Sequence, residues 1–490
     1  MSGPSLIIIG AGIGGLSAGC YAQLSGIETH VFEMHTLPGG LCTSWDRSGY
    51  TFDGSIHHLA GCHPGSRLYA MWEELGAMPR DMLFPEDLTQ VESTDGRRFT
   101  VYTDLDRLEE HMLQSFPGDA AAIRRYLRAL RAMRAHDLLE IPVTGRRGML
   151  RTLSALPTLF RWGRVSMGEA GDFFEDPFLR RAFPTIQYDW PEIPVLIHLN
   201  LLAQCVRRNY GFPAGGSLAF ARSIEERFRS LGGTASYGAR VERILVEGGR
   251  AVGVRLASGE EHRADAVISN AFEHTTLFDL LGKEFLDEET RRRFSRPEDE
   301  MMMGIHVSLG VRRDLSDEPH ALVMLLDEPT TLGERTVDRI SVELYGFDPS
   351  LAPEGKGTIK VLLNASYATW KELAQDPNRY AAEKARLALQ VLRALEPRFP
   401  GLSEQLEVTD VATPLTTERV TGIGRGYAQP EGFGMDMIFS RSKSLKGLAR
   451  FHWVGQSAGG GGIPGCAAMG RHAVRALCKE LRTRFGGAKI

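Results

Sequence analysis

A glycine-rich turn that joins an apolar run to a helical pattern near the N-terminus constrains the fold of this chain most. Residues 5–9 read Ser-Leu-Ile-Ile-Ile, and the turn Gly10-Ala11-Gly12-Ile13-Gly14-Gly15 follows directly. A short β-branched run that ends in glycine predicts a strand, and the apolar spacing from the turn to Leu24 predicts a helix. A strand, a glycine turn and a helix in this order indicate an α/β fold with a Rossmann-type unit.

The glycines of this turn have separate roles. Gly10 supplies the backbone angles of the turn, Gly12 lets the chain approach a pyrophosphate, and Gly15 lets the helix pack on the strand. Gly14 lies between them in the first turn of the helix. A phosphate group is stabilised at this helix N-terminus by unpaired N–H groups and by the helix dipole. The turn therefore predicts a dinucleotide site that includes all four glycines.

A carboxylate follows the second predicted strand, which spans residues 28–32. Glu33 stands at the carboxyl end of this strand, where a carboxylate binds both hydroxyls of an adenosine ribose. An acidic residue at this position disfavours the 2′-phosphate of NADP. The tripeptide Pro38-Gly39-Gly40 follows closely.

A second glycine-rich turn lies near the C-terminus. Residues 451–454 predict a strand, residues 455–465 read Gly-Gln-Ser-Ala-Gly-Gly-Gly-Gly-Ile-Pro-Gly, and a helical pattern continues to Leu481. Two such turns suit a ligand longer than NAD, whose far end meets a second helix N-terminus. The simplest ligand of this kind is FAD.

Further blocks occur in a characteristic order. They are the opening turn, Glu33, Pro38-Gly39-Gly40, Phe212-Pro213-Ala214-Gly215-Gly216-Ser217, a meander at 239–254, a strand at 266–271 and the closing turn at 455–465. In this order the chain resembles the phytoene desaturase family, which includes carotenoid isomerases and retinol saturases and lies within the flavin amine oxidase superfamily.

The resemblance implies a Rossmann-type FAD-binding domain of the glutathione-reductase-like type, with an inserted α+β substrate domain. The FAD-binding domain is expected from the discontinuous segments 1–70, 210–275 and 425–490. The substrate domain is expected from 71–209 and 276–424. Strand-like runs at 304–311, 321–326, 340–344 and 358–363 predict a sheet beneath a substrate cavity, and 378–395 predicts a helix.

The resemblance also implies which residues contact FAD, with the backbone of Val241 at the adenine and Ile463 near the isoalloxazine ring. The predicted cofactor residues are Gly10, Gly12, Gly14, Gly15, Glu33, Gly39, Gly40, Leu41, Val241, Gly455, Gln456, Ile463 and Pro464. Many relatives carry arginine where this chain has Leu41, so one phosphate or flavin contact is missing. Arg47 is a candidate to replace that contact.

The segment at 49–58 reads Gly-Tyr-Thr-Phe-Asp-Gly-Ser-Ile-His-His. Its Phe-Asp-x-x-Ile-His run resembles retinol saturases more than desaturases, so saturation or isomerisation is as well supported as desaturation. His57 is the candidate catalytic residue, as a proton donor or a substrate-positioning group. The alternative is a loop histidine that hydrogen-bonds to the backbone. Glycines around His57 and His58 disfavour a helical ligand pair, and no metal site is predicted.

Two other features of the sequence have ordinary structural alternatives. Cys466 follows Gly465 at a predicted helix N-terminus, where a thiolate is favoured, but a small core cysteine is the preferred interpretation. Tyr188, Asp189 and Trp190 are candidates to line the substrate pocket, although aromatic residues are often core residues.

Composition excludes several classes of protein. The 490 residues include 57 Lys and Arg against 61 Asp and Glu, and a net charge of −4 gives no field that would attract nucleic acid. The six cysteines lack C-x-x-C spacing, which disfavours a zinc site or a disulfide framework and fits a cytoplasmic, reducing setting. The sequence contains no run of 18 apolar residues, so it predicts no membrane span.

The segment 145–164 has five arginines and no acidic residue, so it carries +5. The apolar positions that share one helical face are Met149, Leu150, Leu153, Leu156 and Phe160. Trp162 follows them, and Pro157 is expected to interrupt the helix. Such a segment fits a helix lying in the interface of a membrane, and it fits equally a surface helix packed on the core.

Together these patterns predict an FAD-dependent oxidoreductase that desaturates, saturates or isomerises C=C bonds of a lipophilic polyene or isoprenoid. NAD(P)H, a quinone or oxygen is the expected redox partner. Two alternatives remain: a flavin amine or protoporphyrinogen oxidase, and a non-catalytic lipid-binding protein resembling the GDP dissociation inhibitors. The intact second glycine turn disfavours the non-catalytic alternative.

Overall fold

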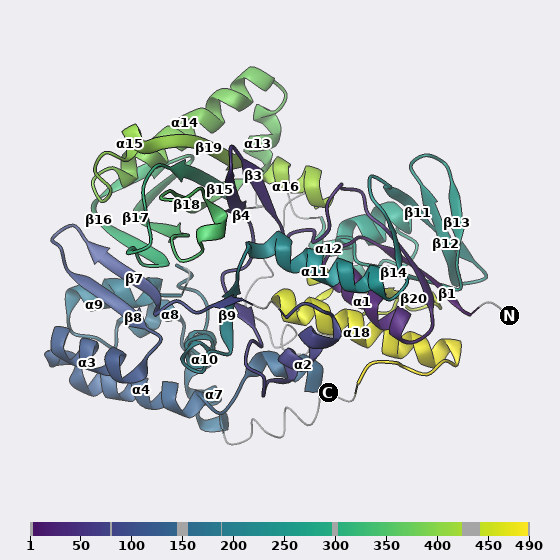
Figure 1. Ribbon diagram of the computed structural model, residues 1–490, viewed down its shortest axis with the longest axis horizontal. Coiled ribbons are helices and arrows are strands. Elements are labelled where there is room, and N and C mark those ends of the chain that lie inside the picture. The colour runs from purple at the N-terminus through teal and green to yellow at the C-terminus, as the bar shows by residue number, and fades with distance from the viewer. Residues whose placement is uncertain are drawn as a thin grey trace.

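The glycine-turn strand lies at the centre of a parallel sheet. The computed structural model describes residues 3–78, 81–144, 155–187, 189–295, 302–423 and 442–488. The sheet has the strand order β10-β2-β1-β14-β20, and every pair in it is parallel. Its strands are β1 (Ser5–Ile9), β2 (Glu28–Phe32), β10 (Thr234–Ser236), β14 (Ala266–Ser269) and β20 (Phe451–Trp453). In Figure 1 the N-terminal helix α1 (Ile13–Leu24, purple) and the C-terminal helix α18 (Gly462–Leu481, yellow) both lie beside this sheet.

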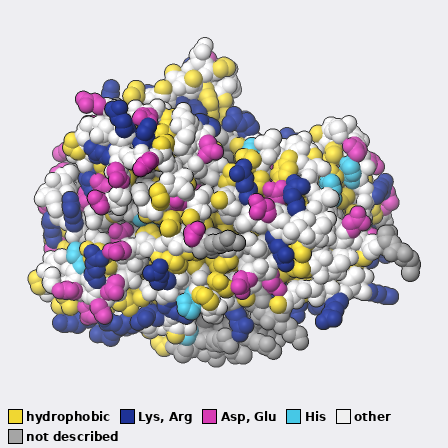
Figure 2. All heavy atoms as spheres, in the orientation of Figure 1, with side chains coloured by type: hydrophobic (Ala, Val, Ile, Leu, Met, Phe, Trp, Pro, Cys, Tyr) yellow, Lys and Arg dark blue, Asp and Glu magenta, His cyan; other side chains and the backbone are white. Residues whose placement is uncertain are grey.

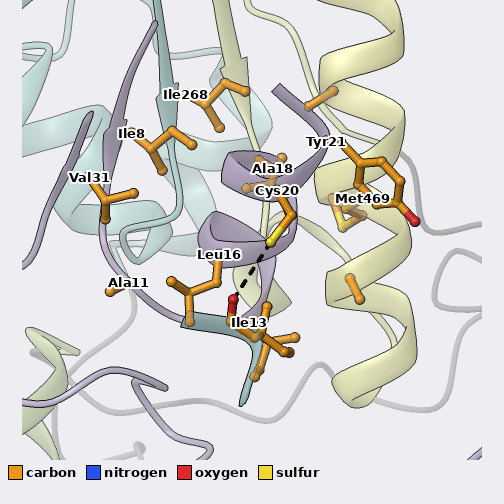
Figure 3. Close-up of a cluster of buried hydrophobic side chains, with 14 of the residues drawn as sticks. Ile8, Ala11, Ile13, Leu16, Ala18, Cys20, Tyr21, Val31, Ile268 and Met469 are labelled. Carbon is orange, nitrogen blue, oxygen red and sulfur yellow. Dashed lines mark hydrogen bonds between the residues drawn. The ribbon is translucent and has the colours of Figure 1, made fainter. Parts of the chain in front are cut away.

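Two helices from opposite ends of the chain pack against each other beside this sheet. They are α1 (Ile13–Leu24) and α18 (Gly462–Leu481). A Cβ on Gly470 would lie 2.4 Å from the Gly14 carbonyl oxygen, so glycine permits this close approach. In Figure 3, α1 lies between Ile8 and Ile268 of the strands and Met469 of α18. The two glycine turns are therefore held next to each other.

The meander predicted at 239–254 forms a three-stranded sheet next to this core. Its strands are β11 (Val241–Glu247), β12 (Arg250–Leu256) and β13 (Glu261–Arg263). Helix α11 (Gly216–Ser230) follows the predicted glycine block and packs on α1, where a Cβ on Gly19 would lie 2.9 Å from the ring of Phe228. Small pairings join β3 (Ser44–Arg47) to β4 (Tyr50–Asp53), and β5 (Leu59–Ala60) and β6 (Met82–Leu83) to β9 (Tyr210–Pro213).

A second, seven-stranded sheet has the order β19-β15-β18-β17-β16-β7-β8. Its strands are β7 (Asp87–Ser93), β8 (Arg98–Tyr102), β15 (Met302–Val311), β16 (Ala321–Leu332), β17 (Arg335–Leu344), β18 (Gly357–Ser366) and β19 (Leu406–Ala412). The four runs predicted at 304–363 are β15 to β18. Strands β7, β8 and β19 are not predicted from the sequence. Helix α14 (Pro377–Leu395) packs on this sheet, one residue longer than its prediction.

A helical region adjoins β7 and β8 and has its own hydrophobic core. Its helices include α3 (Leu105–Ser115), α4 (Ala120–Met133), α7 (Leu156–Trp162), α8 (Met167–Gly171), α9 (Pro177–Ala182) and α10 (Val195–Val206). Other short helices of the described chain are α2 (Arg67–Glu74), α5 (Ile141–Thr144), α12 (Glu288–Arg293), α13 (Tyr367–Leu373), α15 (Leu402–Gln405) and α16 (Pro414–Thr421). The predicted boundaries of the two domains stay predictions.

The basic segment at 145–164 is described from residue 155 onward. Residues 145–154 lie outside the described residues, so the predicted interruption of a helix at Pro157 stays a prediction. Pro157 itself stands in the first turn of α7, where its missing N–H costs no hydrogen bond. Trp162 is buried beside Phe173 and the Arg125 guanidinium, which fits the alternative of a segment packed on the core, whereas Leu156 and Phe160 are exposed. In the part of the chain that the structure describes, no helix is long and apolar enough to cross a membrane.

Candidate functional site

A cavity of about 570 Å³ opens at the carboxyl ends of the parallel strands. Gly10, Glu33, Asn270 and Gly455 follow β1, β2, β14 and β20 and line this cavity. All predicted cofactor residues except Gly15 belong to its wall: Gly10, Gly12, Gly14, Glu33, Gly39, Gly40, Leu41, Val241, Gly455, Gln456, Ile463 and Pro464. The structure therefore brings together residues from three distant parts of the chain.

Gly15 lies outside the cavity wall, and its surroundings explain why. A Cβ at this position would lie 2.1 Å from the Gly10 carbonyl oxygen, so Gly15 lets α1 pack on the turn. Gly10 itself has φ +94°, a backbone conformation that favours glycine. Both glycines thus shape the turn, as their spacing predicts, while only Gly10 faces the cavity.

The start of α1 presents backbone donors to the cavity. Gly12 is the N-cap residue and makes no side-chain cap, so the first N–H groups of α1 have no partner within the helix. Ile13 and Gly14, which carry two of these groups, line the cavity. Unpaired N–H groups and the helix dipole favour an anion such as a pyrophosphate.

Glu33 is a buried carboxylate in the same wall. Its Oε2 accepts the Ala11 N–H at 2.7 Å, and its Oε1 accepts the His35 N–H at 2.8 Å. Burial raises the pKa of Glu33, and these two hydrogen bonds oppose the rise. A carboxylate has about four lone-pair sites, so two backbone donors leave acceptor capacity for ligand hydroxyls. Together with the donors of α1, this acceptor fits the pyrophosphate and ribose of a dinucleotide.

Asn270 is a site residue that the sequence patterns do not single out. A Cβ on Gly12 would lie 2.6 Å from Asn270 Nδ2, and one on Gly14 would lie 2.6 Å from Asn270 Oδ1. A Cβ on Gly455 would lie 2.7 Å from the same oxygen. The amide therefore sits between the two glycine turns. Its position directly after a buried parallel strand is the signal that could have identified it.

Arg47 does not replace the arginine that is absent at Leu41. Leu41 lines the cavity, whereas Arg47 is not among the lining residues. The Arg47 Nε lies 3.1 Å from Asp410 Oδ1, and its Nη1 donates to the Asp46 carbonyl. Arg47 therefore links β3 to β19.

His57 lines the cavity and contacts a carboxylate on the seven-stranded sheet. Its Nδ1 lies 2.9 Å from Glu343 Oε1. Glu343 Oε2 in turn lies 2.7 Å from Lys360 Nζ and accepts the Tyr345 hydroxyl at 2.6 Å. Burial opposes ionisation of Glu343, but the charges and hydrogen bonds of His57 and Lys360 outweigh it and hold the pKa of Glu343 well below its usual range. His57 is thus more than a loop histidine bonded to backbone.

Lys360 connects this pair to the backbone of Asp53, whose carboxyl group is buried. Its Nζ donates to the Asp53 carbonyl oxygen at 3.0 Å, and both residues are almost fully buried. The Asp53 carboxylate accepts the N–H of Ser217 at 2.5 Å and its hydroxyl at 2.8 Å. This network joins β4, α11, β17 and β18, and it holds the loop that carries His57.

The remaining candidates are Cys466 and the residues at 188–190, and their neighbours indicate what role each can have. Cys466 lines the cavity, but desolvation raises its pKa to about 12, so a thiolate is not favoured there. Trp190 lines the cavity, while Asp189 contacts Arg339 Nε at 2.5 Å and accepts from the Ser341 hydroxyl. Tyr188 lies outside the described residues.

Comparison with known proteins gives concordant matches. The family model for flavin-containing amine oxidoreductases matches residues 13–478. The chain is 28% identical to a phytoene desaturase (lycopene-forming) of Pseudescherichia vulneris, over 97% of this chain and 99% of that protein. It is 26% identical to the chloroplastic prolycopene isomerase of Arabidopsis thaliana, over 86% of this chain and 74% of that protein. A crystal structure of an oxidoreductase from Methanosarcina mazei shares the fold, with a TM-score of 0.60 and 19% identity over 97% of this chain and 100% of that one.

Proposed function

Because the chain belongs to the flavin-containing amine oxidoreductase family, we propose that it is an FAD-dependent oxidoreductase acting on carbon–carbon bonds of a lipophilic polyene or isoprenoid. Two of its relatives are a phytoene desaturase and a prolycopene isomerase. The observation that carries the proposal is a single cavity lined both by the predicted dinucleotide residues and by apolar side chains of the helical region. Bound FAD supplies hydride exchange with such bonds.

In this proposal each part of the wall has a task in holding FAD. The first turn of α1 at Gly12 takes the pyrophosphate, and Glu33 accepts hydrogen bonds from the ribose hydroxyls. The backbone of Val241 contacts the adenine. Gly455 and Ile463, at the second glycine turn, contact the flavin end of the molecule.

His57 is proposed to position the substrate or to hold a proton at it. The contact with Glu343 fixes the orientation of the imidazole ring, and Lys360 keeps that carboxylate ionised. A histidine oriented by a carboxylate is the usual arrangement for proton transfer.

Product analysis under anaerobic conditions tests the function and its direction. Oxidised and chemically reduced FAD-loaded protein would be incubated with phytoene, lycopene isomers and retinol. New double bonds made by the oxidised protein identify a desaturase, whereas products from the reduced protein alone identify a saturase or an isomerase. If every compound is returned unchanged by both forms, the proposed substrate class is wrong. With a compound that is converted, NAD(P)H, a quinone and oxygen can be compared as redox partners.

Association with a membrane surface is the second part of the proposal. Leu156 and Phe160 on α7 are 38% and 65% exposed, and Arg161 beside them is exposed. The neighbouring α4 adds exposed arginines, and Lys and Arg side chains follow the lower left edge of the molecule near α3 and α4 (Figure 2). Exposed apolar side chains flanked by arginine fit a surface of anionic lipid.

Replacing both apolar side chains, Leu156→Ser with Phe160→Ser, is expected to weaken binding to anionic phosphatidylserine-containing vesicles by about tenfold or more, because their burial in the interface is lost. Cosedimentation measures this affinity. Leu389→Ser on α14 is the matched control, since Leu389 is 50% exposed but lies far from α7 in the sequence. Equal vesicle binding by the double variant and the control would contradict the proposed docking surface.

A further inference from the structure

The part of the cavity wall formed by the helical region is mostly apolar, yet it contains a buried amide. The apolar lining residues are Leu138, Leu139, Trp190, Ile193, Ile197 and Leu201. Gln187 lines the cavity among them and is 2% exposed. A hydrocarbon substrate has no atom that can hydrogen-bond to this amide. A buried polar group costs free energy unless it is hydrogen-bonded, so an amide in this wall is unfavourable for binding a hydrocarbon.

Two buried side chains behind the wall determine how this amide is oriented. Gln187 Oε1 lies 3.1 Å from His198 Nδ1, and His198 Nε2 lies 2.7 Å from the Tyr126 hydroxyl. Burial lowers the pKa of His198 to about 3, so the ring is neutral and carries one N–H. The Tyr126 hydroxyl has no other acceptor among the described residues, so it donates to Nε2. The N–H is therefore on Nδ1 and donates to Gln187 Oε1.

This orientation directs the amide nitrogen of Gln187 away from His198. Within the described parts of the chain, that NH₂ group has no hydrogen-bond partner. An apolar ligand that displaces water from this donor would leave it unpaired at a cost of about 1–3 kcal/mol, whereas a ligand oxygen would accept its hydrogen bond. The amide nitrogen of Gln187 is therefore a hydrogen-bond donor of fixed orientation that a ligand in the cavity can use.

A second polar group in the same wall is held equally firmly. Asn200 Oδ1 accepts the Leu138 N–H at 3.0 Å, and Asn200 Nδ2 donates to the Tyr210 hydroxyl at 3.3 Å. The Tyr210 hydroxyl donates to buried Asp137 at 3.0 Å. Both Asn200 and Tyr210 line the cavity. Asn200 and Tyr210 therefore form a second fixed polar group in the wall, and Gln187 differs from them because its NH₂ group makes no hydrogen bond to the described residues.

We propose that the Gln187 amide donates a hydrogen bond to an oxygen atom of the substrate, so that the substrate is an oxygenated isoprenoid carrying a hydroxyl, carbonyl or carboxylate group. This inference rests on the proposed function and narrows its substrate class. Hydrocarbon polyenes leave the amide unpaired and bind more weakly. Sites that hydrogen-bond a polar group of the substrate discriminate strongly against analogues that lack it.

A binding comparison on the FAD-loaded protein tests the proposal. Retinol and retinal are compared with the hydrocarbon of the same skeleton that lacks the oxygen, with affinity followed by quenching of tryptophan fluorescence. The oxygenated compounds are expected to bind about tenfold or more tightly. Gln187→Met, which keeps the side-chain length, is expected to remove this preference by weakening the binding of the oxygenated compounds and strengthening that of the hydrocarbon, which no longer leaves an amide unpaired.

A second variant tests the orientation of the amide. Tyr126→Phe removes the hydroxyl that fixes the His198 tautomer, so the preference for oxygenated ligands is expected to fall only in part while FAD content is retained. Equal affinity for both ligand classes, or an unchanged preference in Gln187→Met, would overturn the inference and leave the proposed function standing. If neither class binds to the FAD-loaded protein, both proposals fail.

Discussion

Replacing Gly15 with alanine is expected to remove most of the flavin from the purified protein. The added Cβ would lie 2.1 Å from the Gly10 carbonyl oxygen, a backbone atom that cannot turn aside. The start of α1 would have to move away from the turn, and its N–H groups would move with it. Overpacking of this kind costs about 1–3 kcal/mol or more. The flavin-to-protein absorbance ratio after gel filtration is expected to fall about tenfold.

Gly118→Ala is the matched control for this prediction. An added Cβ at Gly118 meets no atom within 4 Å, so this variant is expected to keep its flavin and its thermal stability. Full flavin content in Gly15→Ala would show that the turn is not the cofactor site.

Replacing Lys360 with methionine is expected to destabilise the protein by about 3–5 kcal/mol, because it breaks a buried ion pair by removing one partner. Lys360 is 3% exposed and bonds to Glu343 Oε2 and to the Asp53 carbonyl oxygen. Without the cation, the Glu343 carboxylate and the Asp53 carboxyl group lose their nearby positive charge. Urea unfolding of the flavin-loaded protein, followed by circular dichroism, measures the change.

A neighbouring lysine provides the control for this second prediction. Lys356 pairs with Glu407 at 2.6 Å near the surface, where both side chains are about 30% exposed. Lys356→Met is expected to cost about 1 kcal/mol or less. The double variant Lys360→Met with Glu343→Leu is expected to recover part of the lost stability. Equal losses in the two lysine variants would rule out a special role for the buried network.

Local patterns were sufficient for the elements that depend on neighbouring residues. Strands β1 and β2 begin and end where their β-branched runs and glycines predict, and α14 follows its apolar spacing to Leu395. Strands β7 and β8 form a hairpin around Asp95-Gly96, a local turn signal that was overlooked, whereas β7 also pairs with β16, more than two hundred residues later. No local pattern records such a pairing.

The candidate site likewise contains residues that a local sequence pattern predicts and residues that only tertiary packing brings to the site. The glycine turns and Glu33 were found because their spacing itself expresses the chemistry of a dinucleotide site. His57 was found from a short motif, but its partner Glu343 was not, because only the folded sheet brings that carboxylate to the loop. Gln187 gave no signal in the sequence at all. Its role depends on His198 and Tyr126, which reach it through tertiary packing.

The visible absorption spectrum of the purified protein, with identification of the chromophore released on denaturation, tests the account most directly. The account predicts a yellow protein that releases one FAD per chain. A colourless protein that stays colourless after incubation with FAD would contradict it, and would favour a lipid-binding protein without redox chemistry.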